Sequence, residues 1–294
     1  MSRWLVTGAR GMLGRDLLTV LEDRGEAVTG LSRSDLDITD TGAVGDALAR
    51  WEPEVVVNCA AWTAVDDAEA SEDAALRVNG EAVAGLAAGC AARRAALVQV
   101  STDYVFDGLG REPYPEDGRP APRTAYGRTK LAGERAVLGQ PGLAGYVVRT
   151  AWLYGAHGPN FVATMTRKER GPDQVHVVDD QRGQPTWSMD VADRIHALIA
   201  SAAAPGVYHA TSSGETTWFG LAREVFRLLG ADPARVRPAT SSALARPAPR
   251  PGYSVLGHAA WARAGLTPIG GWQQALQRGL PGLAAVAAAA EPAP

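Results

Sequence analysis

Short apolar runs alternate with longer amphipathic segments along the first half of the chain. The apolar runs occur at residues 4–7, 27–31, 55–59, 96–100 and 146–150. Helical patterns separate them at residues 13–24, 43–51, 73–93 and 125–138. Strands that are apolar throughout, without alternation, are typical of a parallel sheet that helices cover on both faces. The pattern therefore predicts an α/β fold with a Rossmann-type, doubly wound parallel sheet.

The regularity weakens after residue 150. Helical patterns follow a Gly, Pro and Asn-rich loop at 154–160, then recur at 191–202, 217–229 and near 271–278; strand-like runs lie at 174–178 and 207–210, and a Pro- and Arg-rich segment at 235–251. We expect residues 1–150 to form the Rossmann domain, together with segments within 174–210. We expect residues 151–280 to form mainly a smaller C-terminal α/β lobe, and the Ala- and Pro-rich residues 284–294 to be a disordered tail.

Composition excludes several classes of protein. The 294 residues are 46% hydrophobic and 21% charged, with a formal net charge of −3, as in an ordinary globular enzyme or binding protein. The slightly acidic balance offers no basic surface for nucleic acid, and no run of about 18 apolar residues could span a membrane. The first residues lack a secretory h-region, so we expect a cytoplasmic protein. Two cysteines, Cys59 and Cys90, are too few for a disulfide framework or a thiolate metal site.

A glycine loop follows the first predicted strand and opens the first predicted helix. Gly8, Gly11 and Gly14 have the spacing G-x-x-G-x-x-G. Small residues let the backbone turn tightly and approach a pyrophosphate, while the helix N-terminus offers free N–H groups. Such a triplet can be a plain structural turn, but its place in the first βα unit favours dinucleotide binding by residues 1–150.

Charged residues after the second predicted strand bear on the choice of dinucleotide. An acid such as Asp37 would hydrogen-bond a ribose 2′-hydroxyl, whereas Arg33 would accommodate a 2′-phosphate. Because Arg33 comes first after the strand, we expect NADPH, with NADH as the alternative. A solvated charged loop without a role in binding is the competing interpretation.

A tyrosine and a lysine lie four residues apart at the start of the predicted helix 125–138. The spacing places the Tyr126 phenol and the Lys130 ammonium on one helix face, where a fixed cation would favour the phenolate. Thr102 ends the preceding strand, at the sheet edge where open α/β proteins bind ligands. The three side chains could exchange a proton with a carbonyl or alcohol oxygen. An isolated Y-x-x-x-K is more often an ordinary surface pair, although Lys130 is one of only two lysines in the chain.

Together these residues resemble the dTDP-4-dehydrorhamnose reductase family, within the extended short-chain dehydrogenases. Matching stretches lie at 8–14, 58–69, 101–108, 126–134, 149–155, 158–161, 180–186 and 250–254. The resemblance implies a catalytic triad of Thr102, Tyr126 and Lys130. It also implies NADPH or NADH binding by Gly8, Arg10, Gly11, Met12, Leu13, Gly14, Arg33, Asp37, Ile38, Cys59, Ala60, Ala61, Thr63, Tyr126 and Lys130.

The resemblance further assigns substrate-binding residues in the C-terminal lobe and at the sheet edge. These are Val65, Thr102, Tyr104 and Trp152 around a deoxysugar, and Asn160, Phe161, Gln184 and Arg250 near the nucleotide part of a dTDP-sugar. Trp152 could instead be a core residue, and Arg250 a loop charge. Some relatives form a Mg²⁺-dependent dimer through surface glutamates, but only Asp16 offers a counterpart here and the five histidines lack ligand spacing. We therefore expect no metal, in a monomer or a homodimer.

The implied reaction is NADPH-dependent reduction of the C4 ketone of dTDP-4-dehydro-L-rhamnose to dTDP-L-rhamnose. A 4-ketoreductase of an antibiotic deoxysugar or a streptose-type pathway would use nearly the same residues. A 4,6-dehydratase is disfavoured because Asp103 and Tyr104 follow Thr102, where dehydratases carry Asp-Glu, and a 4-epimerase also matches less well. A non-catalytic NADP-binding regulatory subunit is the rival from another class.

Overall fold

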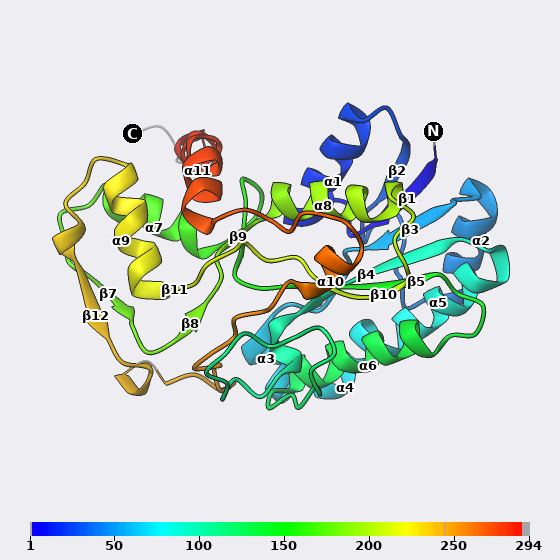
Figure 1. Cartoon of the computed structure of the whole chain (residues 1–294), viewed down its shortest axis with the longest axis horizontal. Coiled ribbons are helices and arrows are strands. Elements are labelled where there is room, and N and C mark those ends of the chain that lie inside the picture. The colour runs from blue at the N-terminus through cyan, green and yellow to red at the C-terminus, as the bar shows by residue number, and fades with distance from the viewer. Residues whose placement is uncertain (1, 244, 290–294) are drawn as a thin grey trace.

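A six-stranded parallel sheet forms the centre of the computed structural model, which describes residues 2–243 and 245–289. Its strand order is β10-β5-β4-β3-β1-β2, and each neighbouring pair is parallel (Figure 1). The strands are β1 (Arg3–Thr7), β2 (Ala27–Leu31), β3 (Val55–Asn58), β4 (Ala96–Thr102), β5 (Gly145–Thr150) and β10 (Gly206–His209). The order reverses between β1 and β3, which makes their carboxyl ends the switch point where such sheets bind ligands.

Helices cover both faces of this sheet because alternate strand residues point to opposite sides. Trp4 and Val6 pack with α1 (Met12–Asp23) and α8 (Ser188–Ala200) on one face. Leu5 packs on the other face with α2 (Thr41–Trp51), α5 (Ala82–Arg93) and α6 (Ala125–Gly139). The predicted doubly wound α/β fold is confirmed.

The predicted helix at 73–93 is divided into three parts. It comprises α4 (Glu72–Leu76), a π-helical turn η1 (Arg77–Glu81) and α5. Within the π-turn, the Asn79 side chain accepts from Trp62 N (2.9 Å) and donates to Trp62 O (3.1 Å) and Thr129 Oγ1 (3.1 Å). The turn thereby fixes the loop after β3 to α6. The short helix α3 (Val65–Ala70), which the sequence pattern did not predict, lies between this loop and α4.

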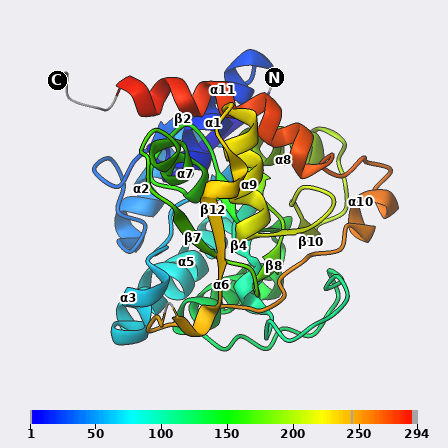
Figure 2. The same cartoon turned by 90° about the vertical axis from the view of Figure 1, so that its left-hand side faces the viewer.

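A second lobe lies beyond the carboxyl edge of the sheet, on the left of Figure 1 and facing the viewer in Figure 2. Its core joins α7 (Phe161–Glu169), α9 (Trp218–Leu228) and α11 (Trp272–Ala289). Short strand pairs complete it: β7 (Val175–Val178) with β12 (Val236–Ala239), β8 (Arg182–Gly183) with β11 (Thr216–Thr217), and β6 (Leu153–Tyr154) with β9 (Thr186–Trp187). The remaining elements are α10 (Ala259–Arg263) and the 3₁₀ turns η2 (Asp103–Val105), η3 (Pro233–Arg235) and η4 (Ser241–Ala243).

The chain crosses between the sheet and the lobe several times. Within 174–210, β10 joins the central sheet, whereas β7 belongs to the lobe. Helix α11 continues through Ala289, so residues 284–289 are helical and differ from the expected disordered tail. Leu283 of this helix is buried in the lobe core. Residues 290–294 lie outside the described residues.

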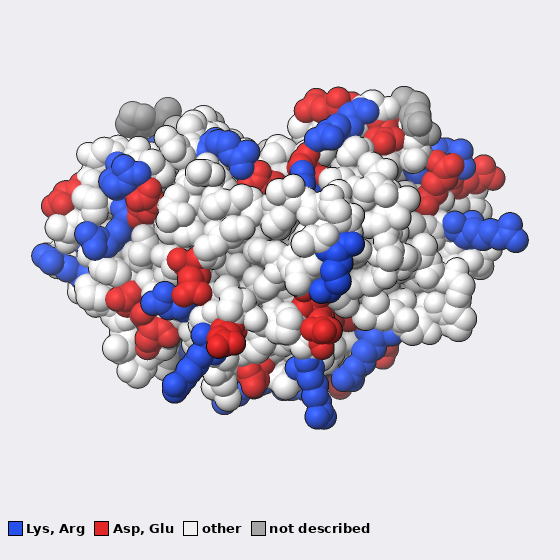
Figure 3. All heavy atoms as spheres, viewed as in Figure 1, with Lys and Arg blue, Asp and Glu red and all other residues white. Residues whose placement is uncertain are grey.

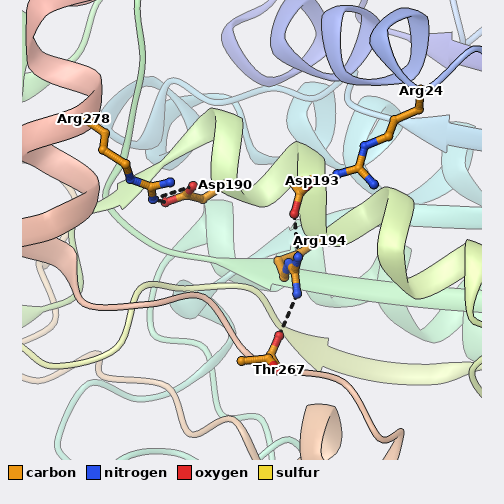
Figure 4. A network of polar contacts seen from close by, with 6 residues as sticks. All are labelled: Arg24, Asp190, Asp193, Arg194, Thr267 and Arg278. Atoms are coloured by element: carbon orange, nitrogen blue, oxygen red, sulfur yellow. Dashed lines mark hydrogen bonds and ion pairs between the residues drawn. The ribbon is translucent and has the colours of Figure 1, made fainter.

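Polar contacts join α8 to α11 of the lobe, to α1 and to the segment around Thr267 (Figure 4). Arg278 of α11 donates to both Asp190 oxygens, at 2.9 and 2.8 Å, and Arg194 Nη1 donates to Thr267 O at 2.8 Å. Asp193 pairs with Arg24 of α1. Because partly exposed pairs contribute only about 0–1 kcal/mol each, the buried face of α8 supplies most of the packing energy.

The charged side chains visible in Figure 3 are of both signs and interspersed, and the middle of that face is mostly uncharged. None of the helices in the described part of the chain combines the length and hydrophobicity needed to cross a membrane.

Candidate active site

A cleft of about 1890 Å³ runs along the carboxyl edge of the sheet and continues against the lobe. Its walls include the glycine loop after β1, the ends of β3 and β4, the start of α6 and the segment 245–251. Every residue predicted to bind cofactor or to act in catalysis lines this one cleft. Of the predicted substrate residues, Val65, Thr102, Tyr104, Trp152, Phe161 and Arg250 also line it.

The glycine loop is shaped for close approach of a ligand. Gly8 has φ +66°, and a Cβ there would lie 2.7 Å from both Ala60 N and the Cys59 carbonyl carbon, so only glycine fits. Helix α1 begins next to it, and its N-cap, Gly11, supplies no side-chain cap. The first N–H groups of a twelve-residue helix therefore point toward the cleft, which suits the pyrophosphate of a dinucleotide.

The loop after β2 presents its basic and acidic side chains differently. Asp37 Oδ1 accepts from Thr39 N (3.0 Å) and Thr39 Oγ1 (2.8 Å), and these hydrogen bonds lower the pKa of Asp37. Arg33 is exposed in the same part of the cleft. An exposed guanidinium beside a carboxylate already engaged by Thr39 is better suited to a phosphate than to a hydroxyl.

Helix α6 places Tyr126 and Lys130 opposite the end of β4. The helix starts at a well-capped position, since Thr124 Oγ1 accepts from Gly127 N (3.0 Å) and Glu69 Oε1 accepts from Ala125 N (2.9 Å). Lys130 is only 4% exposed, and its Nζ donates to Val100 O at 2.7 Å. The sequence spacing thus does bring the phenol and the amine to one face of α6 beside Thr102, with Tyr126 half-buried and Lys130 buried.

Burial changes both pKa values in the direction that favours the neutral forms. It raises the pKa of Tyr126 to about 12, although a hydrogen bond with Thr102 opposes the rise. It lowers the pKa of Lys130 to about 8. Desolvation thus opposes the phenolate that the nearby cation was expected to favour, and Lys130 turns toward Val100. At neutral pH Tyr126 holds its proton and can donate it.

Asp103 holds the Thr102 hydroxyl, a role that the sequence analysis did not assign to it. Its Oδ1 accepts from Thr102 Oγ1 (3.0 Å), while Tyr104 N donates to the same hydroxyl (3.2 Å). Burial raises the pKa of Asp103 to about 6. The Thr102 hydroxyl is therefore held by two neighbours beside Tyr126. The position of Asp103 directly after Thr102 was the only feature of the sequence that indicated this contact.

Two predicted residues do not line the cleft. Asn160 caps α7 by accepting from Ala163 N (2.9 Å), and its Nδ2 donates to Gly155 O (2.9 Å). Gln184 is buried, donating to Leu256 O (3.1 Å) and accepting from Leu256 N (2.8 Å). Both amides hold loops in place in this structure, and their assignment to the substrate stays a prediction.

Arg250 lines the cleft but also pairs with a residue of the Rossmann domain. Its Nη1 and Nη2 donate to the two Asp66 oxygens at 2.9 and 2.7 Å. Asp66 lies in α3 next to Val65, which faces the cleft. The pair joins the segment 245–251 of the lobe to the Rossmann side of the site.

Comparison with known proteins decides the family. The family model described as "RmlD substrate binding domain" matches residues 2–284. A dTDP-4-dehydrorhamnose reductase from Streptomyces griseus is 59% identical over 99% of this chain and 97% of that protein. The chain belongs to the dTDP-4-dehydrorhamnose reductase family. The resemblance found in the sequence is thereby confirmed, and with it the assignment of the chain as an oxidoreductase.

Two further relatives of this chain bear on its substrate and cofactor. A dTDP-4-keto-6-deoxy-D-glucose reductase from Streptomyces niveus is 55% identical, over 95% of this chain and 96% of that protein. The crystal structure of dTDP-4-dehydrorhamnose reductase from Bacillus anthracis in complex with NADP has a TM-score of 0.91 and 34% identity, covering 95% of this chain and 98% of that one. Because the similarity extends over almost the whole chain, it includes both the Rossmann domain and the C-terminal lobe that line the cleft.

Proposed function

We propose that the protein reduces the C4 ketone of dTDP-4-dehydro-L-rhamnose to dTDP-L-rhamnose with NADPH. The observation that carries the proposal is the set of buried Thr102 and Lys130 with half-buried Tyr126, opposite a glycine loop in a cleft that continues into the lobe. Such a cleft can hold a dinucleotide against the sheet and a second nucleotide against the lobe.

NADPH would supply a hydride to the ketone carbon when bound. We assign its pyrophosphate to the backbone N–H groups at Gly11–Met12 and its 2′-phosphate to Arg33, for the reasons of geometry given above. Lys130 would hold the nicotinamide ribose with its ammonium. The Bacillus anthracis relative was solved with NADP, which supports the same preference here.

The chain's own contribution is to place the ketone and to provide a proton. The Thr102 hydroxyl, which donates to Asp103 in this structure, would turn its single proton to the ketone oxygen, and Tyr126 would give that oxygen its phenolic proton as negative charge develops. The O–H bond of Tyr126 breaks, an O–H bond forms on the sugar, and the phenolate left behind is stabilised by Lys130. A pKa raised to about 12 ensures that Tyr126 starts this step protonated.

A related keto sugar is the second candidate substrate. The 55% identity to the dTDP-4-keto-6-deoxy-D-glucose reductase of Streptomyces niveus favours reduction of another dTDP-4-keto-6-deoxy sugar as the alternative, as in the deoxysugar pathways considered above. A non-catalytic NADP-binding subunit would not need Thr102 and Lys130 buried beside Tyr126, since burying polar groups costs free energy that binding alone does not recover.

The test is the loss of NADPH absorbance with purified dTDP-4-dehydro-L-rhamnose, run beside NADH and beside the D-configured 4-keto sugar. Rapid oxidation of NADPH with the L-sugar is the expected result. Oxidation only with the D-sugar would replace the substrate by the alternative above. Binding of NADPH without oxidation of any keto sugar would replace the enzyme by the regulatory subunit. A chelator should leave the rate unchanged, because no metal is part of the proposal.

A further inference from the structure

Two tryptophans are stacked face to face in the wall of the cleft. The ring centroids of Trp152 and Trp218 lie 3.6 Å apart with an interplanar angle of 7°. Both rings line the cleft, yet they come from different parts of the chain, after β5 and at the first residue of α9. Trp218 also contacts Phe161, at a centroid distance of 4.7 Å.

Trp152 has a backbone conformation that requires support from its surroundings. Its φ is +46°, in the left-handed region that a bulky residue rarely adopts. Thr186 N donates to its carbonyl at 3.2 Å, which fixes the backbone. A Cβ on Gly183 would lie 2.5 Å from Trp152 Cε2, so the ring fits only because residue 183 has no side chain. The neighbours therefore specify one position for this ring.

Trp218 is itself fixed by hydrogen bonds outside the stack. Its Nε1 donates to Gln181 Oε1 at 3.1 Å, and Gln181 Nε2 donates to Ser241 Oγ at 2.8 Å. Thr217, the N-cap of α9, accepts from Gly220 N at 3.0 Å. The capped helix and the hydrogen bond to Gln181 thus fix the Trp218 indole, which can serve as a rigid support for Trp152.

We propose that Trp218 is a positioning residue that holds the Trp152 ring in place as the wall of the deoxysugar site. This inference rests on the proposed function and on the assignment of Trp152 to the deoxysugar that the family resemblance implies. Trp218 acts through Trp152, so it affects how the keto sugar sits and leaves cofactor binding unchanged. Stacked aromatic rings bury large apolar area and have a preferred geometry, which makes the support specific to an aromatic side chain.

The experiment compares Trp218→Ala and Trp218→Phe with Phe219→Ala. Phe219 is the next residue of α9, is half-buried against the same lobe core, and does not line the cleft, so it controls for loss of lobe packing. We measure kcat and KM for the keto sugar, the Kd for NADPH, and the circular dichroism couplet that two stacked indoles produce. Trp218→Ala is expected to lose the couplet and to lower kcat/KM for the sugar about tenfold or more, since small misplacements in a site have effects of this size.

The expected pattern is an unchanged Kd for NADPH in all three variants, partial rescue of kcat/KM by Trp218→Phe, and nearly normal kinetics in Phe219→Ala. Equal loss in Trp218→Ala and Phe219→Ala would overturn the positioning role in favour of general lobe stability. A Trp218→Ala variant that keeps wild-type kcat/KM would overturn it as well.

Binding of dTDP-L-rhamnose, measured by calorimetry, separates this inference from the proposed function. If the wild-type protein binds that sugar nucleotide but reduces no keto sugar, the proposed function fails. The affinities of the three variants then decide the role of Trp218 alone: a selective loss in Trp218→Ala supports it, and equal affinities overturn it. If the wild-type protein does not bind the sugar nucleotide, both proposals fail.

Discussion

At the scale of single residues, burial sets the protonation state of the two groups on α6. Tyr126 is neutral at physiological pH, and its proton is the one that the proposed reduction consumes. Tyr126→Phe removes this proton but leaves the ring and its packing. We expect turnover to fall about 10²-fold or more, while the Kd for NADPH stays within about twofold of the wild-type value. Steady-state kinetics and fluorescence titration of the same variant check the two expectations. Near-normal turnover would remove Tyr126 from the mechanism.

The lowered pKa of Lys130 predicts how activity depends on pH. Below about pH 8 Lys130 is an ammonium that can hold the nicotinamide ribose, and above it the charge is lost. We expect kcat/KM for NADPH, which reports the free enzyme, to fall as pH rises through about 8.

The same shift has the opposite effect on stability, which separates activity loss from unfolding. Between about pH 8 and the ordinary lysine pKa of 10.5 the folded chain binds fewer protons at Lys130 than the unfolded chain does. The contribution of Lys130 to stability therefore rises over this window while activity falls. Lys130→Arg stays charged throughout, so its kcat/KM, although lower, should lack the decrease near pH 8; a decrease that persists would assign it to another group.

The sequence could predict some of these residues and not others. The i, i+4 spacing of Tyr126 and Lys130 was sufficient to place both on one face of α6. The spacing could not show how strongly desolvation there opposes the phenolate and raises the pKa of Tyr126. Trp218 has no local signal at all, because its partner Trp152 lies 66 positions away and the stack exists only in the folded lobe.

At the scale of elements, α6 is held to the sheet by a buried ion pair. Glu134 accepts from Arg149 Nε (2.8 Å) and Nη2 (2.7 Å) of β5 and from Ser101 Oγ (2.6 Å) of β4. Glu134→Gln leaves the Arg149 charge buried without a counter-ion. We expect a loss of about 3–5 kcal/mol in the free energy of unfolding, measured by urea denaturation.

A second ion pair on the same helix is the matched control. Arg128 of α6 pairs with Glu72 at 2.6 Å, and both side chains are about two-fifths exposed, at 44% and 40%. Glu72→Gln should change stability by no more than about 1 kcal/mol. Similar losses of unfolding free energy in Glu134→Gln and Glu72→Gln would mean that burial does not determine how strongly an ion pair holds α6.

Elements were predictable where their hydrophobic pattern is long enough to show a period. The five strands of the first half and the helices at 125–138 and 217–229 correspond to β1, β2, β3, β4, β5, α6 and α9 within a few residues. Two-residue strands such as β8 and β11 carry no period, and β12 lies in a Pro- and Arg-rich segment that predicts a loop. These strands form only because the lobe core aligns their backbones.

At the scale of the whole molecule, the cleft is assembled from segments far apart in sequence. Asp66 and Arg250 are separated by 184 positions, and the carboxylate also accepts from Ala248 N at 3.2 Å. Their pairing sets how the segment 245–251 of the lobe lies against α3. Nothing in the local sequence around either residue indicates its partner, and so the sequence predicted Arg250 as a ligand contact without the residue that orients it.

Asp66→Asn is therefore expected to loosen the closure of the cleft without touching its chemistry. Asp66 does not line the cleft, whereas Arg250 does. A partly exposed pair contributes up to about 1 kcal/mol, which corresponds to about fivefold in affinity. We expect KM for the sugar nucleotide to rise about fivefold with kcat nearly unchanged, and backbone amides at 246–250 to exchange hydrogen faster.

The control is Asp67→Asn, at an exposed neighbour on the same helix, which should change neither KM nor the exchange rates. If Asp66→Asn instead lowers KM, the carboxylate competes with the substrate's diphosphate for Arg250, and the pair restrains binding rather than preparing the site for it.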